Sequence, residues 1–234
     1  MNGHPNTETS TAGPLLDSPH NSLHSALHSA LHSSLHRSLA EGAAEAARVA
    51  RGITPGQLTG ATPCRDFDTR TLVNHWVLYT SHGLEHRARR EQLPADLEHR
   101  DFTAVPGWAD AYAAQLDRAV AAWAEPAVWE GVIDSGGGPT PAPELAALLL
   151  AELVVHGWDV ARATGQEFRC SEETAGQVLG VVAANAELYR KYQGFGEPVA
   201  VPADSPALVR ALALSGRDPR WSAGARGQNL PDRL

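Results

Sequence analysis

The sequence has few cysteines and no long apolar run. Its two cysteines, Cys64 and Cys170, are too few for a disulfide framework, so we expect both to be thiols. The longest apolar stretch, residues 145 to 155, contains Glu152 and is followed by His156, whereas a membrane-spanning helix needs about 18 apolar residues or more. The first residues also lack the features of a secretory signal. These absences argue against a disulfide-stapled or membrane-spanning protein and predict a cytoplasmic location.

Basic residues are scarce too. The chain has 27 acidic against 19 basic residues, a formal charge of −8, and an acidic chain is unsuited to nucleic acid because binding depends on basic side chains that displace counterions. Hydrophobic residues make up 43% of the 234 positions, which is enough to fill a core. We therefore expect a globular protein without nucleic-acid or membrane partners, and its oligomeric state stays open.

Apolar residues at helical spacing predict an all-α fold. The first helix is expected to end at Gly52, and the second to start after Asp66 or Asp68 and to run to about residue 91. The third begins near Pro106, and the fourth ends at Gly165. The loop of residues 126–143 leaves room for a short extended piece at 128–133. Four helices with moderate loops are typical of an antiparallel four-helix bundle.

A four-residue repeat precedes the first helix. Histidines occur at positions 20, 24, 28, 32 and 36, and a leucine follows each of them three residues later. Four residues advance a helix by about 400°, so these histidines spread around it and cannot all bind one metal. Neighbouring pairs such as His24 and His28 can chelate a transition metal weakly, but the plainer interpretation is a frayed or partly docked helical extension. We assign residues 1–36 to a disordered, low-complexity tail, 37–165 to the bundle and 166–234 to a helical annex packed on it.

Polar residues interrupt the apolar face of the fourth predicted helix. Leucines 145 and 149, Glu152, His156, Asp159 and Ala163 follow one another at steps of four and three residues and so share one face. An ionised glutamate that is buried without a partner is unfavourable, so we expect a partner group to contact the Glu152 carboxylate. His75 lies on the apolar face of the second predicted helix. His75, Glu152 and His156 together make a set of two histidines and one glutamate with a vacant fourth position, as in catalytic zinc sites.

Other interpretations of these residues stay open. Glu152 can instead pair with an arginine from another helix, and both histidines can be hydrogen-bonded core residues. Asp159 either orients the His156 ring or forms a salt bridge with Arg162.

The surroundings of the three residues offer further candidates. His82 and His86 follow His75 on the same helical face, where they line a pocket mouth or belong to a solvated helix end. His82, Tyr79 and Trp158 are the candidate cofactor-binding residues, although aromatic residues at such spacing are usually core. Cys64 is expected to be a small buried residue and not a nucleophile.

Two motifs, ATPCRDFDTRTLVNHW and LAELVVHGWDVARATGQ, resemble the metal-binding domain of the mycothiol-dependent maleylpyruvate isomerase family, which belongs to the DinB-like helical bundles of actinobacteria. The closing FGEPVAVPADSPALVRALALSGRDPRW is similar to the tail of its stand-alone members. The resemblance implies Zn²⁺, or another divalent transition metal, on His75, Glu152 and His156. It also implies mycothiol as cosubstrate, with its thiol ionised at the metal.

The resemblance implies a metal- and thiol-dependent enzyme, either an isomerase or an S-transferase. The isomerase itself has a second α/β domain, which the last 69 residues do not resemble, so the reaction and its catalytic residues stay open. The expected partners are a small-molecule thiol and an electrophilic substrate. The alternative is a non-catalytic helical bundle that binds or senses a metal.

Overall fold

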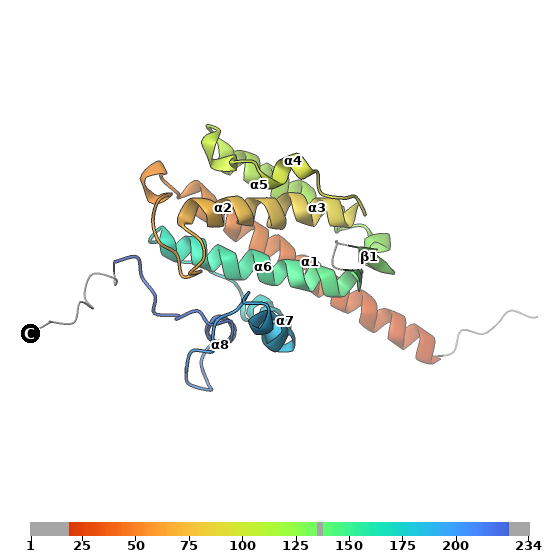
Figure 1. Cartoon of the computed structure of the whole chain (residues 1–234). Helices are drawn as coiled ribbons and strands as arrows, with labels where there is room; N and C mark the ends of the chain where they lie inside the picture. Colours follow the sequence, from red (N-terminus) through yellow and green to blue (C-terminus); the bar gives the residue numbers. More distant parts are fainter. Residues whose placement is uncertain (1–18, 135–137, 225–234) are drawn as a thin grey trace, which may run out of the picture.

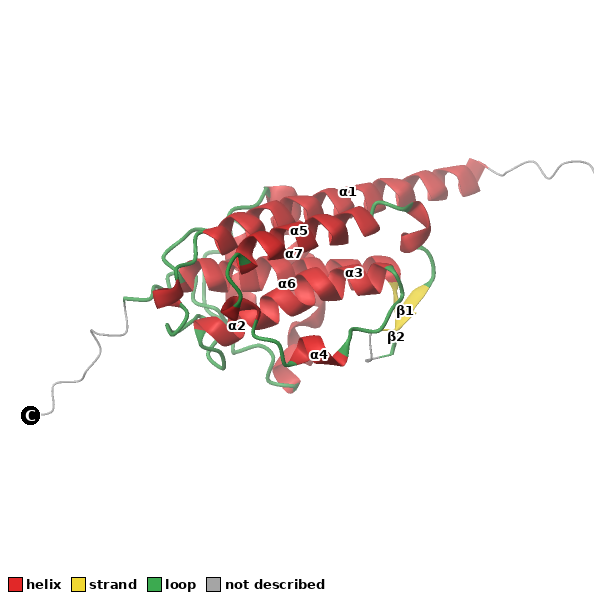
Figure 2. Ribbon diagram, turned by 90° about the horizontal axis from the view of Figure 1, so that it is seen from above, coloured by secondary structure: helices red, strands yellow, loops and turns green. Residues whose placement is uncertain are grey.

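The structure, a computed structural model, describes residues 19–134 and 138–224 and is mostly helical there (Figures 1 and 2). Its helices are α1 (Pro19–Arg51), α2 (Thr69–Val77), α3 (Gly83–Ala88), α4 (Ala95–Glu98), α5 (Trp108–Ala122), α6 (Ala142–Ala163), α7 (Glu172–Lys191) and α8 (Ala207–Leu214). Short 3₁₀ turns occur at Pro55–Gln57, Phe102–Ala104 and Pro126–Trp129. No helix among these residues is long and apolar enough to cross a membrane.

A small sheet is the main departure from the predicted all-α fold. Strands β1 (Val132–Asp134) and β2 (Pro139–Pro141) pair antiparallel, with Ile133 opposite Thr140. They lie in the glycine- and proline-rich loop, where the sequence predicted a short extended piece at residues 128–133. The extended backbone starts later than predicted, because Pro126–Trp129 forms a 3₁₀ turn.

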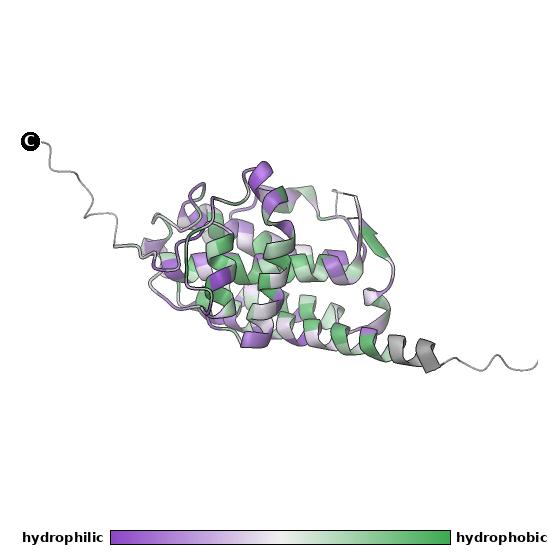
Figure 3. Cartoon of the chain, turned by 90° about the horizontal axis from the view of Figure 1, so that it is seen from below, coloured by the Kyte–Doolittle hydropathy of each residue, from purple (hydrophilic) through white to green (hydrophobic). Residues whose placement is uncertain are grey.

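The core forms where the long helices meet. α1 contacts α5 and α6, α2 contacts α6, and α3 contacts α5. Most of α6 is buried because α1, α2 and α7 all pack on it, as expected for a helix with apolar residues on most sides. Hydrophobic and hydrophilic residues both occur along the helices (Figure 3). The largest fully buried side chains include Trp76, Trp123, Tyr112 and Leu39.

The second predicted helix is divided in two. Asp68 is its cap, since its Oδ1 accepts a hydrogen bond from the Thr71 backbone N–H at 2.8 Å. A π-helical turn, Leu78–His82, then separates α2 from α3. Within this turn the Thr80 hydroxyl donates to the backbone carbonyl of Trp76, four residues earlier, a side-chain bond that commonly bends helices. The helix ends at Ala88, slightly before the predicted residue 91.

The histidine repeat is part of α1, so the assignment of residues 1–36 to a disordered tail is wrong from residue 19 onward. Residues 1–18 lie outside the described part of the chain. Leu35 and Leu39 are buried, and a His36 ring nitrogen lies 3.0 Å from the Val120 carbonyl oxygen. The repeat docks through these contacts, while Leu31 is 65% exposed. The N-terminal part of α1 extends past the other helices (Figure 1).

The C-terminal helices cover one side of α6. α7 contacts α6 and α1, and α8 contacts α7. Gly165, with φ +71°, follows the end of α6 as predicted. The segment after α8 then returns to α6, where Arg162 donates a hydrogen bond from Nε to the Trp221 carbonyl at 2.9 Å. Residues far apart in the sequence are thereby brought beside the C-terminal end of α6.

Candidate metal centre

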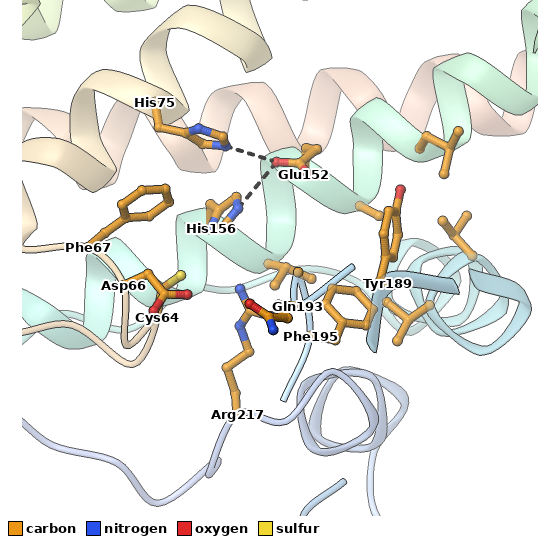
Figure 4. Close-up of a pocket in the computed structure, with 16 residues that line it drawn as sticks. Cys64, Asp66, Phe67, His75, Glu152, His156, Tyr189, Gln193, Phe195 and Arg217 are labelled. Carbon is orange, nitrogen blue, oxygen red and sulfur yellow. Dashed lines mark ion pairs between the residues drawn. The ribbon is translucent and has the colours of Figure 1, made fainter. Parts of the chain in front are cut away.

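His75, Glu152 and His156 meet between α2 and α6. The Glu152 Oε2 atom lies 3.5 Å from His75 Nε2 and 3.3 Å from His156 Nε2 (Figure 4). One potential ligand atom from each residue lies within 4.8 Å of the other two. The structure therefore brings together the three residues that the sequence indicated.

Two atoms of this triad have no hydrogen-bond partner although they are buried. They are His75 Nε2 and Glu152 Oε2. Buried polar atoms are nearly always paired, so an orphaned nitrogen and oxygen facing one another need an explanation. A divalent cation between them provides one, and imidazole with carboxylate suits zinc, cobalt or nickel. Within the described residues no arginine forms an ion pair with Glu152, contrary to the alternative interpretation.

The triad combines an ionised carboxylate with a histidine whose pKa is raised. Burial opposes ionisation of Glu152, but the two histidines outweigh it and hold the pKa of this carboxyl well below its usual range. Burial also disfavours a charged His156, yet Glu152 and Asp159 raise the pKa of His156 to about 9. Glu152 is thus an anion at neutral pH, and in the metal-free protein a proton on His156 balances its charge.

Asp159 orients the His156 ring. Its Oδ2 atom accepts a hydrogen bond from His156 Nδ1 at 3.1 Å, and its side chain is fully buried. With Nδ1 held in this way, Nε2 is the nitrogen that faces Glu152, the arrangement usual for metal-binding histidines. The alternative bridge from Asp159 to Arg162 is wrong, because Arg162 donates to a backbone carbonyl instead.

Arg217, which the sequence analysis did not single out, pairs with Asp159. Its Nη2 lies 3.0 Å from Asp159 Oδ2, and the residue is only 5% exposed. The preceding Gly216 has φ +84°, and a Cβ there would lie 2.5 Å from the Gly196 Cα, so only glycine fits at this position. Arg217 is far from Asp159 along the chain and shares no helix with it, so helical periodicity could not have predicted their contact.

A cavity of about 260 Å³ opens beside the triad. The loop before α2 contributes Cys64, Asp66 and Phe67 to its walls. The end of α7 and the segment after it contribute Tyr189, Gln193 and Phe195, and Arg217 lies at its base in Figure 4. All three residues of the triad line this cavity, so a small molecule that enters it reaches them.

Cys64 lies in the cavity wall as a half-buried thiol. Burial raises the pKa of Cys64 to about 11. A thiol with that pKa is almost fully protonated at neutral pH and is therefore a poor nucleophile, in agreement with the expectation that Cys64 is not one.

The three candidate cofactor-binding residues do not line this cavity. Tyr79 packs on the far side of His75, with ring centroids 4.7 Å apart. Trp158 lies two residues beyond His156, roughly 200° around the helix, and is buried in the core. His82 stacks on Phe102 at 5.4 Å, because the π-helical turn rotates it away from the face of His75. His86 contacts the His82 carbonyl.

Comparisons with known proteins were consistent with this geometry. The family model described as "Mycothiol maleylpyruvate isomerase N-terminal domain" matches residues 39–161, a range that contains the whole triad. Two uncharacterized proteins of Mycobacterium tuberculosis, one from strain H37Rv and one from strain CDC 1551, are each 28% identical over 168 residues, which is 70% of this chain and 87% of theirs. No solved structure matches the chain.

Proposed function

The chain belongs to the mycothiol maleylpyruvate isomerase N-terminal domain family, and from this premise we propose that it binds zinc on His75, Glu152 and His156 and activates mycothiol there. The observation that carries the proposal is that His75 Nε2 and Glu152 Oε2 lie 3.5 Å apart, buried and without a hydrogen bond to any described residue. Three protein ligands beside an accessible cavity suit a catalytic site, because a purely structural site gains stability by closing its fourth position.

The metal would supply one chemical function, which is to lower the pKa of a bound thiol so that a thiolate forms near neutral pH. The residues of the chain prepare the site for it. Asp159 holds the His156 ring, and Arg217 keeps Asp159 ionised in the core. Cys64 lines the same cavity as a half-buried thiol, and in the metal-free protein burial raises the pKa of this thiol to about 11.

For the reaction we propose thiol S-transfer to a small electrophile that enters the cavity beside the triad. Residues 166–224 form α7 and α8, and α7 contributes to the wall of this cavity. We further propose a cytoplasmic protein whose core is an antiparallel, DinB-like four-helix bundle made of α1, α2 with α3, α5 and α6. The contacts of α1 with α5 and α6 and of α2 with α6 support this arrangement.

Cobalt substitution tests the proposal directly. The full chain, purified without an affinity tag, is loaded with one equivalent of Co²⁺ and titrated with mycothiol. We expect a sulfur-to-cobalt charge-transfer band in the near ultraviolet for the wild type and none for the His75→Ala/His156→Ala double variant. Equal metal content in the two proteins would contradict the assignment of His75 and His156 as metal ligands. Metal in the wild type without thiol ligation would favour the alternative, a non-catalytic metal-binding or metal-sensing protein.

A further inference from the structure

The cavity beside the triad has two chemically different sides. Figure 4 shows Cys64 and Asp66 on one side of the triad and Tyr189 and Phe195 on the other. The second side is completed by aliphatic side chains of α6 and α7, namely Leu148, Ala151, Val181 and Val182. The Tyr189 and Phe195 rings pack edge to face at 4.8 Å and make this wall continuous. We call these six residues the apolar wall.

The apolar wall is incompletely covered by the rest of the described chain. Val182 is 1% exposed, but Leu148, Val181, Tyr189 and Phe195 are only half-buried. Small-molecule sites are typically concave, mostly apolar surfaces with a few polar groups that orient the ligand. The apolar wall with the triad at its edge has this composition, and a molecule lying on it would remove more of the wall from water.

None of the six described residues of the apolar wall offers a positive charge for an anionic ligand. Arg217 is the one lysine or arginine among the residues that line the cavity, and Asp159 already neutralises it through contacts of 3.0 to 3.4 Å. The Arg217 guanidinium also packs over the Phe195 ring at 5.7 Å. Asp66, which lines the opposite side, is itself acidic. A metal held by the triad would face Glu152 and the incoming thiol, so a ligand carboxylate against the apolar wall would lose its hydration without gaining an unpaired lysine or arginine as a partner.

We infer that the electrophile of the S-transfer is an uncharged, apolar molecule bound against the apolar wall, and not a carboxylate; this rests on the proposed function. For an alkyl halide, the thiolate sulfur forms a bond to the carbon while the carbon–halogen bond breaks. The halide leaves with the electron pair, and the proton of the thiol goes to solvent. We expect the polar part of the thiol to bind on the polar side of the cavity, beside Asp66 and Gln193.

A pair of substrates that differ in one para substituent, a methyl group or a carboxylate, tests this inference. The zinc-loaded full chain is given mycothiol with 4-methylbenzyl chloride or 4-(chloromethyl)benzoate, and each rate is divided by the rate without protein to remove intrinsic reactivity. We expect kcat/KM, corrected in this way, to be at least tenfold higher for 4-methylbenzyl chloride. Equal values, or a preference for the benzoate, would overturn the inference.

A new cation in the apolar wall should change the preference. Val181→Lys places an ammonium group beside the bound electrophile and is expected to raise the corrected rate with the benzoate and lower it with 4-methylbenzyl chloride. Leu188→Lys is the matched control, since Leu188 lies on the same helix but is 53% exposed and does not line the cavity. The same shift in both variants would show that net charge, and not the apolar wall, sets the preference, and would overturn the inference.

Binding of the two thioether products separates this inference from the proposed function. The affinities of S-(4-methylbenzyl)mycothiol and S-(4-carboxybenzyl)mycothiol for the zinc-loaded chain are measured by calorimetry, which needs no turnover. Tighter binding of the methyl compound, together with no turnover of either chloride, would contradict thiol activation but support the apolar ligand site. Equal binding of both compounds would overturn the inference whatever the turnover.

Discussion

His75 and His156 lie on different helices and meet at a carboxylate, whereas His32 and His36 lie one turn apart on the single helix α1. At this carboxylate, His75 Nε2 and Glu152 Oε2 are buried and form no hydrogen bond with the described residues. The second pair has other contacts: His32 stacks on Trp129 with ring centroids 5.1 Å apart, and His36 contacts the Val120 carbonyl.

The two regions differ in the residues that surround each helix and not in the spacing of side chains along it. A step of four residues places two side chains on one helix face in both regions. On α6, this step joins Glu152 to His156, and α2 brings His75 to the same point. On α1, the neighbouring elements contribute a ring and a carbonyl, which hold the helix in place. Four experiments test whether the two regions differ in this way.

The largest effect is expected for metal affinity. His156→Ala should lower the affinity for zinc roughly a thousandfold or more, because losing an outer partner alone costs about 10- to 100-fold. Metal content after dialysis and competition with a chromogenic chelator measure the change. The control is His32→Ala/His36→Ala, which should keep wild-type affinity; if this control loses the tight site instead, the two regions have been assigned the wrong roles.

Breaking the ion pair behind His156 should cost stability. Arg217→Met leaves Asp159 as a buried charge without its cation, and we expect the free energy of unfolding to fall by about 3 kcal/mol. Zinc affinity should fall about tenfold or more, since Asp159 would no longer be held beside His156. Urea denaturation and chelator competition measure both effects.

Arg169→Met is the control for that variant, because Arg169 pairs with Glu167 on the surface, with both side chains more than 70% exposed. It should change the stability by less than about 0.5 kcal/mol. An equal loss in both variants would show that the burial of Arg217 is unimportant.

The contributions of the two regions to stability should depend on pH in opposite directions. In the metal-free protein, Glu152 and Asp159 overcome burial and raise the pKa of His156 to about 9. Its stabilising contribution is therefore complete below the unfolded value of about 6.5 and is lost as the pH rises through about 9. Burial, then the nearby His28, lowers the pKa of His32. The contribution of His32 is present above about 6.5 and is lost as the pH falls through its folded pKa.

Histidine ring signals in NMR spectra of the metal-free protein measure both titrations. Zinc should abolish the transition near pH 9 and leave that of His32 unchanged. Loss of both transitions on adding zinc would place metal at the repeat as well.

The smallest effect concerns the docking of α1. His36→Ala removes the contact with the Val120 carbonyl and should lower the free energy of unfolding by about 1 kcal/mol, without a change in zinc affinity. Thermal unfolding with and without zinc measures both quantities. His99→Ala replaces an exposed histidine and should leave both unchanged; a loss of zinc affinity in His36→Ala would contradict the separation of the two regions.

Local patterns in the sequence predicted much of this molecule. The face that carries Glu152, His156 and Asp159 follows from helical periodicity, and the ends of α2 and α6 follow from an aspartate cap and a glycine. The division of the second helix was not predictable in this way, because the π-helical turn depends on side-chain bonds to the backbone and on the packing of Leu78–His82. For the same reason His82 lies away from the face that carries His75, although the two residues would share a face on an ideal helix.

The sequence by itself determined that the chain is mainly helical, that it has no apolar run long enough for a membrane span, and that one face of α6 carries ligand-capable side chains. These properties depend on composition and on neighbours within a few turns of helix. Only the tertiary structure decided that His75 meets Glu152, that Arg217 neutralises Asp159, and that α7 gives the cavity an apolar wall. Such contacts join residues tens of positions apart, and they exist only because packing of the helices fixes their relative positions.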